Sequence, residues 1–196
     1  MNKERTSARL QKLANVLEKR QKDLTLVLAN IHDPHNVSAI YRSCDAFGVP
    51  RVHLYYTHTA FPALAAKSSA SARKWVETAR HKSAESLMEA MRAEGKTIYA
   101  TSCSPKARPL QDYDLSKPSA IILGNEHSGV DNELTALADA ELYIPMYGMI
   151  QSFNVSVAAA LILYEASRQR KSAGLYDAPT YTPEEFDALF EAWSKK

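Results

Sequence analysis

The order of hydrophobic and polar positions divides the chain into strand-length apolar runs separated by segments with helical spacing. Runs long enough for strands cover residues 24–31, 51–56, 97–101, 120–123 and 142–146. Apolar runs without alternation are typical of strands that are covered on both faces. Apolar residues at intervals of three and four predict helices within residues 6–21, 36–47, 84–94, 130–138, 155–173 and 182–194.

The helix that begins near Asn36 illustrates the helical spacing. Its apolar stripe consists of Val37, Ile40, Tyr41 and Cys44. Asn36 is well placed to be its N-cap. Arg42 lies off the stripe, and helical side chains lean toward the N-terminus. We therefore expect its guanidinium to reach back toward the polar turn at residues 32–36.

The stretch from Glu141 to Arg170 carries the strongest pattern in the chain. A short apolar run breaks at Gly148 into a polar turn that leads directly into a long helix. From Val155 to Tyr164 this helix is apolar on nearly every face, which predicts burial on nearly every face. A polar loop held between a buried strand and a buried helix is a favoured place for a ligand site.

Capping signals and one ambiguous segment complete the pattern. Ser128 with Asp131, and Thr182 with Glu185, fit capping boxes before two of the predicted helices. Residues 57–79 have no clear period. Their Ala and Ser content permits a helix, and the core candidates in this segment are Trp75 and Val76.

Strands that alternate with helices predict an α/β fold, a parallel sheet with helices on both faces. We expect the chain to have three parts: a basic helical extension over residues 1–22, a central domain over 23–172, and a helical extension over 173–196.

Composition narrows the class of protein. The chain has 196 residues, 45% of them hydrophobic, so it can bury a core. No apolar run approaches the roughly 20 residues of a membrane span, and the amino terminus resembles no secretory signal. The two cysteines, Cys44 and Cys103, fit a reducing compartment and show no metal-ligand spacing. We therefore expect a cytoplasmic protein without a metal.

The net charge is only +2, but the basic residues are concentrated in two parts of the chain. Basic side chains crowd residues 1–22, and a second basic cluster at Arg168, Arg170 and Lys171 ends the long helix. Two interpretations remain open from charge alone. These residues either form solvated helix faces or follow the phosphates of a nucleic acid.

Three polar loops follow predicted strands: HDPHN at 32–36, GNEHSG at 124–129 and YGMIQSFN at 147–154. If the strands are neighbours, these loops converge on one crevice. The dinucleotide-binding, phosphate-loop and nucleophile-elbow patterns are all missing from the sequence. This disfavours a dehydrogenase, an NTPase and a serine hydrolase.

Three longer segments resemble a known family. NVSAIYRSCDAFG (36–48), ILGNEHSGV (122–130) and IPMYGMIQSFNVSVAAALILYE (144–165) are similar, in order and spacing, to the three signature motifs of the SpoU (SPOUT) ribose methyltransferases. The resemblance extends to the basic amino-terminal helix and to residues 168–177. Within the family, the chain most resembles the TrmH-type tRNA (guanosine-18 2′-O)-methyltransferases.

The resemblance implies an enzyme that uses S-adenosyl-L-methionine (SAM), a deep trefoil knot near the carboxyl terminus, and a homodimer that contacts through the long helix. It implies tRNA as the partner and methylation of a ribose 2′-hydroxyl in the D-loop. It places the cofactor against loops that contain Thr101, Leu123, Gly124, Ile144, Met149 and Phe153.

The resemblance also implies the residues that act on the substrate. They are Asn36, Arg42, Glu126, Ser152 and Asn154. In the family the arginine is assigned the role of taking the proton of the hydroxyl. Lowering the pKa of a guanidinium by about six units, into the neutral range, costs roughly 8 kcal/mol at 1.36 kcal/mol per unit. We therefore prefer a cationic Arg42 that binds a phosphate and the developing alkoxide, with Asn36 orienting it.

Basic positions that match tRNA-gripping residues of the family are Arg9, Lys12, Arg20, Arg168 and Arg170. Two alternatives stay open. One is an enzyme that methylates another tRNA or rRNA nucleotide, although rRNA members usually carry an added amino-terminal domain. The other is an RNA-binding or chaperone protein that has the fold without catalysis, and the intact signature residues disfavour it.

Overall fold

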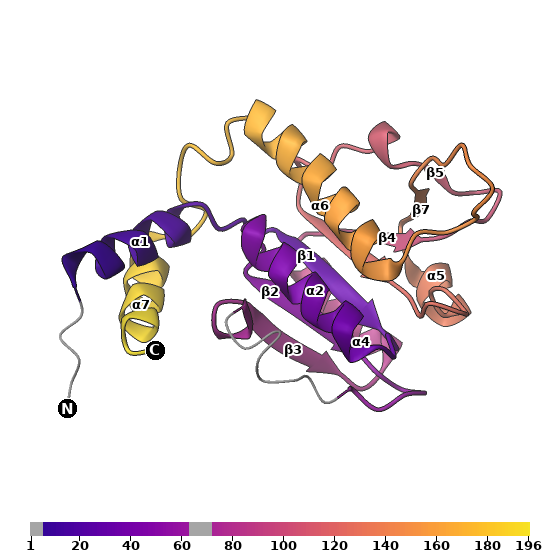
Figure 1. Cartoon of the computed structure of the whole chain (residues 1–196), viewed down its shortest axis with the longest axis horizontal. Helices are drawn as coiled ribbons and strands as arrows, with labels where there is room; N and C mark the ends of the chain where they lie inside the picture. The colour runs from indigo at the N-terminus through magenta and orange to yellow at the C-terminus, as the bar shows by residue number, and fades with distance from the viewer. Residues whose placement is uncertain (1–5, 63–71) are drawn as a thin grey trace.

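One parallel sheet forms the centre of the protein in a computed structural model that describes residues 6–62 and 72–196. The order of its described strands is β3-β2-β1-β6-β4-β7-β5 (Figure 1). The strands are β1 (Leu24–Ala29), β2 (Arg51–Tyr55), β3 (Glu77–His81), β4 (Thr97–Thr101), β5 (Arg108–Pro109), β6 (Ser119–Leu123) and β7 (Ala140–Tyr143). All pair in parallel. The predicted α/β class with a parallel sheet is therefore confirmed.

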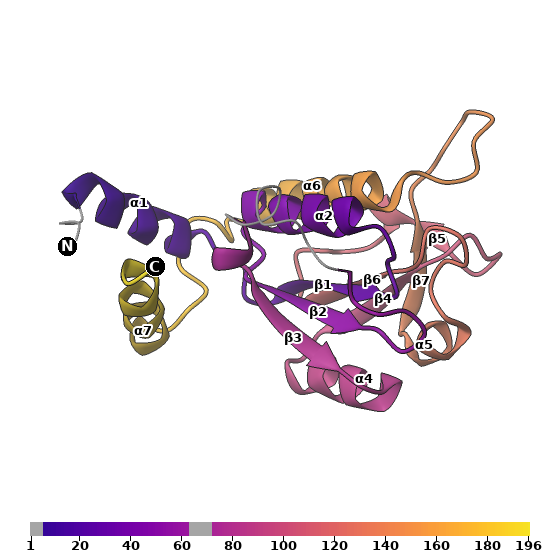
Figure 2. The same cartoon turned by 60° about the horizontal axis from the view of Figure 1, so that its bottom comes forward.

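Helices cover both faces of the sheet. The α-helices are α1 (Ser7–Glu18), α2 (Pro34–Ala46), α4 (Ala84–Ala93), α5 (Asn132–Leu137), α6 (Val155–Ser172) and α7 (Pro183–Ser194). Two 3₁₀ turns, η1 (Ala72–Lys74) and η2 (Leu110–Asp112), complete the described elements. Helices α2 and α6 lie side by side on one face, and α4 lies on the other (Figure 2).

The two faces have separate hydrophobic cores because the central strands contribute alternate side chains to each. Leu26 and Leu28 of β1 join the core beneath α2 and α6. Val27 and Ala29 of the same strand join the core beneath α4. All six residues of β1 are buried, as its continuous apolar run predicts.

Helices α1 and α7 pack on each other at one end of the molecule, beside the sheet (Figure 1). Their shared core contains Leu13, Leu17 and Trp193, and Trp75 contacts Trp193 with ring centroids 4.9 Å apart. Thr182 and Glu185 form the predicted capping box at the start of α7.

From β1 the chain adds β2 and β3 on one side of the sheet. The strands β4, β7 and β5 lie on the other side, and β6 is inserted between β1 and β4. The loops that follow β1, β6, β4 and β7 all leave from the carboxyl edge of the sheet. In open α/β sheets a reversal of strand order opens a crevice at this edge. The fold thus places the three polar loops found in the sequence at one location.

The start of α2 differs from the prediction. Asp33, and not Asn36, is the N-cap, and its side chain accepts a hydrogen bond from the backbone N–H of His35 at 2.8 Å. Pro34 occupies the first turn, where its fixed φ and missing N–H are tolerated. The helix therefore begins earlier than the apolar spacing predicts, and Asn36 is a buried residue inside it.

Helix α6 is only partly buried, contrary to the prediction from its apolar faces. Ala159, Ile162 and Leu163 are fully buried. Val157, Leu161 and Tyr164, three to four residues apart, are 45%, 37% and 61% exposed. The helix thus presents an apolar stripe that nothing in the described part of a single chain covers.

Two short edge strands were absent from the prediction. β3 is mostly polar, and β5 has only two residues, so neither carries an apolar run. The helix considered possible within residues 57–79 falls partly on 63–71, which lie outside the described residues. The predicted capping box of Ser128 and Asp131 does not form, because α5 begins only after Asp131, which is its N-cap and whose carboxylate accepts from Asn30 Nδ2 at 2.9 Å.

Strands β2 and β3 carry a stacked histidine pair. The rings of His53 and His81 lie 5.1 Å apart, and His53 Nδ1 is 2.8 Å from His81 Nε2. His53 is buried, and its Nε2 has no hydrogen-bond partner among the described residues. Burial, followed by the charge of His81, lowers the pKa of His53 from 6.5 to about 3.

We expect the free energy of unfolding to fall as the pH drops below about 6.5. In that range unfolded His53 binds a proton and folded His53 does not, at up to about 1.4 kcal/mol per pH unit. His53→Gln should make the decline shallower between about pH 6.5 and 4, as measured by urea unfolding. The control, His127→Gln, changes an exposed side chain and should keep the wild-type slope. Parallel curves for wild type and His53→Gln would contradict this.

Candidate active site

A cleft of about 1580 Å³ lies at the carboxyl edge of the sheet. Loops after β4, β6 and β7, together with the first turns of α6, line it. We call it the strand-end cleft, and its walls are residues 101–107, 123–130 and 141–155 with gaps. It occupies the crevice at which the sheet topology predicts a ligand.

A hydrogen-bonded chain of three side chains joins the polar loops. Asn36 Nδ2 donates to Glu126 Oε1 at 2.7 Å, and Asn154 Nδ2 donates to Asn36 Oδ1 at 3.0 Å. The backbone N–H of His32 is 3.4 Å from Glu126 Oε2. We call Asn36, Glu126 and Asn154 the loop network. The three loops therefore meet as predicted, but only those after β6 and β7 line the cleft, while the loop at 32–36 joins them from beside it.

Asn154 serves two elements at once. Its Oδ1 accepts from the backbone N–H of Ser156 at 2.9 Å, which caps α6. Its Nδ2 reaches Asn36 in α2. The start of α6 is therefore held against the start of α2 by one amide side chain.

Asn30 and Asn125 are positioning residues that sequence reasoning missed. Asn30 has a φ of 52° and is 4% exposed. Its side chain accepts from the backbone of Thr57 and His58 and donates to Asp131, while its carbonyl accepts from Asn125. Asn tolerates the left-handed region better than most residues. An Asn directly after an apolar strand is therefore the sequence feature that could have indicated this turn.

Five of the six predicted cofactor residues line the strand-end cleft. These are Thr101, Leu123, Gly124, Ile144 and Phe153. Met149 is 99% exposed and does not line it. The difference arises because the tip of the loop between β7 and α6 projects outward (Figure 2), and Tyr147 at this tip is also 99% exposed.

Gly124 is required by a close approach of two backbones. A Cβ atom at this position would lie 2.1 Å from the carbonyl carbon of Gly129 and 2.2 Å from the nitrogen of Val130. Only glycine permits this spacing. The loop after β6 is thereby folded tightly on itself, and Asn125 and Gly129 pair through two backbone hydrogen bonds.

Glu141 places a further carboxylate in the wall of the strand-end cleft. Ser104 Oγ donates to Glu141 Oε2 at 2.7 Å. Hydrogen bonds from Ser102 and Ser104 hold the pKa of the Glu141 carboxyl below its ordinary value. The Thr101 hydroxyl donates to the carbonyl of Ile122 at 2.9 Å, so it fixes β4 against β6.

Arg42 and Ser152 are exposed. Arg42 makes no hydrogen bond or ion pair with the described residues and does not line the strand-end cleft, whereas Ser152 does. The expected contact between Asn36 and Arg42 is absent, because the amide of Asn36 bonds to Glu126 and Asn154 instead. Arg42 thus remains free to bind an anion.

Arg20 and Arg170 correct the predicted set of RNA-binding residues. Both are 0% exposed. Arg20 pairs with Asp45 at 2.5 Å, and Arg170 pairs with Asp23 at 2.5 Å. A buried guanidinium with these partners has no surface to offer to a phosphate, so both arginines have structural roles.

Arg170 links α6 to the segments around β1 and β6. Besides Asp23, it donates to Gln21 Oε1 at 3.1 Å and to the carbonyls of Leu115 and Lys117 at 3.0 and 2.9 Å. The other predicted RNA contacts, Arg9, Lys12 and Arg168, are exposed. Arg168 also pairs with Glu165 at 2.8 Å.

The described residues contain neither a metal-binding cluster nor a membrane-spanning helix. Within 6–62 and 72–196, no group of three or more His, Cys, Asp or Glu side chains is arranged to hold a metal ion. No helix in the same ranges is long and apolar enough to cross a membrane.

Comparisons with known proteins give consistent matches. The SpoU rRNA Methylase family matches residues 23–164. A tRNA (guanosine(18)-2′-O)-methyltransferase of Thermus thermophilus is 44% identical over 194 residues, 99% of this chain and 100% of the relative.

Two solved structures resemble the fold. The crystal structure of the A. aeolicus TrmH/SpoU tRNA modifying enzyme matches with a TM-score of 0.89 at 38% identity, over 96% of this chain and 95% of the other. The SpoU methyltransferase AviRb from Streptomyces viridochromogenes, in complex with the cofactor AdoMet, matches with a TM-score of 0.62 at 29% identity, over 79% and 59%.

Arg170→Gln should lower the free energy of unfolding by about 2–4 kcal/mol, because it leaves Asp23 and two carbonyls without their partner. Arg168→Gln, two residues away on the same helix, removes an exposed ion pair and should cost less than about 1 kcal/mol. Urea denaturation followed by circular dichroism measures both. Equal losses in the two variants would show that the buried contacts are not the reason.

Proposed function

The chain belongs to the SpoU methylase family, and we propose that it transfers a methyl group from SAM to the ribose 2′-hydroxyl of guanosine 18 in tRNA. The observation that carries the proposal is the loop network, which unites the three family motifs beside the strand-end cleft. The full-length similarity to the Thermus thermophilus enzyme supports tRNA as substrate and guanosine 18 as the target.

The strand-end cleft suits SAM in its lining. Ile144 and Phe153, both half-buried, provide apolar surface for an adenine ring, while Leu123 is 1% exposed and lies beneath it. The tightly folded backbone at Gly124 and Gly129 brings peptide groups to the wall, where they can bind polar atoms. When bound, SAM supplies an electrophilic methyl group. AviRb, which was solved with AdoMet, supports this assignment.

The loop network positions the reaction rather than carrying a proton. Asn36, Glu126 and Asn154 satisfy one another, so they hold the loops after β1, β6 and β7 in one geometry. Alignment of the attacking oxygen with the methyl carbon supplies much of the rate in such a transfer. Ser152, exposed at the cleft, is available to a ribose hydroxyl.

Arg42 acts as a cation in this proposal. Its exposed, unpartnered guanidinium can bind the phosphate next to the target ribose and the negative charge that develops on the 2′-oxygen. The proton of the hydroxyl then leaves to a phosphate oxygen or to water. Because one chain does not bring Arg42 into the strand-end cleft, the RNA or a second chain completes the site.

We further propose a homodimer that contacts through the exposed stripe of α6. Val157, Leu161 and Tyr164, three to four residues apart on α6, are exposed together on one side of the helix. Contiguous apolar side chains of this kind are typical of association surfaces. The trefoil knot near the carboxyl terminus, and the division into residues 1–22, 23–172 and 173–196, follow from the family resemblance and remain part of the proposal.

Exposed Arg9, Lys12 and Arg168 would contact tRNA phosphates, while Arg20 and Arg170 would not. A tRNA substrate also suggests the cytoplasm, in agreement with the two free cysteines among the described residues.

The wild-type protein should transfer label from SAM to a tRNA transcript, with the methyl group found on ribose 18 after nuclease digestion and mass spectrometry. A transcript with 2′-deoxyguanosine at position 18 should accept no label. Arg42→Lys should lower kcat about 100-fold or more, because Lys lacks the planar fork. Arg92→Lys, on the opposite face of the sheet, is the control. Methylation at another nucleotide would overturn the site assignment, and tRNA binding without methyl transfer would favour a non-catalytic RNA-binding protein.

Leu161→Glu should convert a dimer into a monomer in sedimentation velocity, since it places a charge in the centre of the α6 stripe. The side chain is already 37% exposed, so the variant should fold. Ser172→Glu, exposed at the end of the same helix, should leave the dimer intact. A wild-type protein that sediments as a monomer at micromolar concentration would contradict the dimer.

A further inference from the structure

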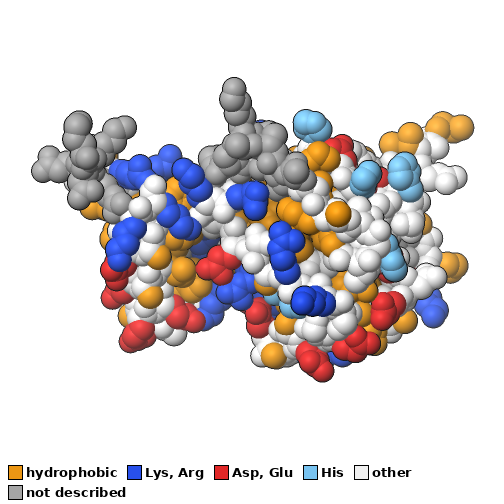
Figure 3. Space-filling view, turned by 90° about the horizontal axis from the view of Figure 1, so that it is seen from below, with side chains coloured by type: hydrophobic (Ala, Val, Ile, Leu, Met, Phe, Trp, Pro, Cys, Tyr) orange, Lys and Arg blue, Asp and Glu red, His pale blue; other side chains and the backbone are white. Residues whose placement is uncertain are grey.

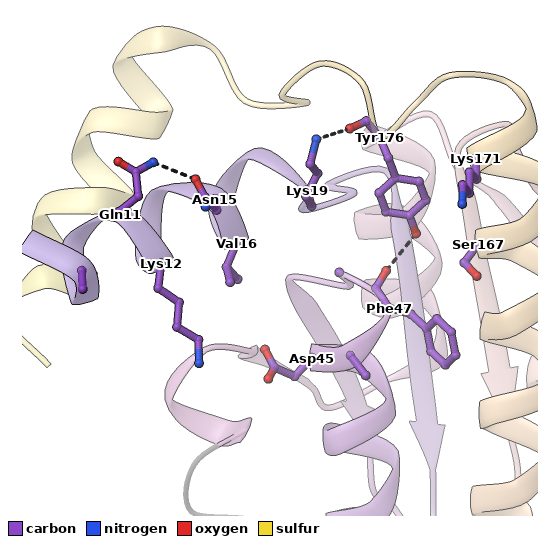
Figure 4. A pocket seen from close by; sticks show the side chains of 13 residues that line it. Gln11, Lys12, Asn15, Val16, Lys19, Asp45, Phe47, Ser167, Lys171 and Tyr176 are labelled. Carbon is purple, nitrogen blue, oxygen red and sulfur yellow. Dashed lines mark hydrogen bonds between the residues drawn. The ribbon is translucent and has the colours of Figure 1, made fainter.

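A second cavity, of about 750 Å³, lies away from the strand-end cleft. It is bounded by α1, by the carboxyl end of α2 at Asp45–Gly48, by the second half of α6, and by Tyr176 (Figure 4). We call it the α1 groove. Figure 3 shows basic side chains gathered over the end of the molecule that holds α1.

Cationic and polar side chains surround the α1 groove. Lys12, Lys19 and Lys171 supply three positive charges from two helices, and Gln11, Asn15 and Ser167 add hydrogen-bonding groups. Among the described lining residues the one acid is Asp45, whose carboxylate already binds Arg20 at 2.5 Å. The groove therefore carries a net positive charge.

Apolar side chains form part of its wall. Val16 of α1 and Phe47 at the end of α2 both line the groove, and both are partly exposed. A surface that only follows phosphates needs amines alone, whereas an aromatic or aliphatic surface can hold a base. Amines beside an apolar wall match the two halves of a nucleotide.

The α1 groove is fixed before any ligand binds. Lys19 Nζ donates to the carbonyl of Tyr176 at 2.6 Å, and the Tyr176 hydroxyl donates to the carbonyl of Phe47 at 3.0 Å (Figure 4). Gly48 has a φ of 79°, and a Cβ there would lie 2.7 Å from the carbonyl oxygen of Lys19. A preformed site loses less entropy on binding than one that must be ordered.

We propose that the α1 groove holds one nucleotide of the tRNA, its phosphate among Lys12, Lys19 and Lys171 and its base against Phe47 and Val16. This inference rests on tRNA being the substrate, as proposed above. It replaces the buried Arg20 and Arg170 with residues that are open to solvent. Arg20 instead neutralises Asp45, the acid that would otherwise repel a phosphate.

Charge favours RNA over a second copy of the chain as the occupant. The surface assigned to the dimer, the α6 stripe, is apolar, whereas the α1 groove is rimmed by lysines. Nucleic acid supplies the complementary charge along its whole length.

The test compares Lys12→Gln/Lys171→Gln with a control of equal charge, Lys82→Gln/Lys117→Gln, whose side chains are exposed outside the groove. Affinity for a tRNA transcript is measured by filter binding over a range of salt concentrations. The groove variant should bind at least tenfold more weakly near 0.15 M salt. Its log-log salt slope should be shallower by about 1.4–1.8, at about 0.7–0.9 per lost contact. The control should lose less than threefold, and SAM affinity measured by calorimetry should not change.

The base is located by cross-linking. A transcript containing 4-thiouridine is irradiated with the wild-type protein, and a cross-link to a peptide with Phe47 or Val16 is expected. Equal tRNA affinity in both variants, or cross-links confined to other peptides, would overturn the inference. So would lysine variants that weaken the dimer in sedimentation and not tRNA binding, because a second chain would then fill the groove. If the wild type methylates no tRNA, the proposed function itself fails.

Discussion

The structure depends on a chain of two hydrogen bonds among three side chains that are distant in sequence. Asn36, Glu126 and Asn154 come from the start of α2, the loop after β6 and the start of α6. Asn36 is buried and Glu126 is half-buried, so the loss of a partner would cost each about 1–3 kcal/mol. Because each satisfies the next, the two helices and the loop share one geometry, and the strand-end cleft has fixed walls.

Much of this arrangement could be predicted from the sequence because its causes are local. The apolar run of β1 requires cover on both faces, and Thr182 with Glu185 caps α7 as the spacing indicates. The convergence of the three polar loops follows from parallel strands. The polar edge strand β3 could not be found this way, because its pairing with β2 comes from backbone hydrogen bonds that leave no hydrophobic pattern.

The arginines show where sequence reasoning ends. Arg168 and Arg170 stand two residues apart in one basic cluster, yet one is exposed and the other is fully buried against Asp23. The pattern of α6 cannot reveal this, because the partner lies nearly 150 residues away along the chain, in the segment before β1. Likewise Asn36 fits an N-cap by type, and only the position of Pro34 and Asp33 moves it inside the helix.

Few side chains could replace Asn154 and keep both of its contacts. Its oxygen end accepts from Ser156 while its nitrogen end donates to Asn36, so the position needs an acceptor and a donor on one short stem. Aspartate provides the first without the second, serine lacks the reach, and glutamine is a carbon too long to cap. Of these four residues, only asparagine both caps α6 and holds the start of α6 against α2.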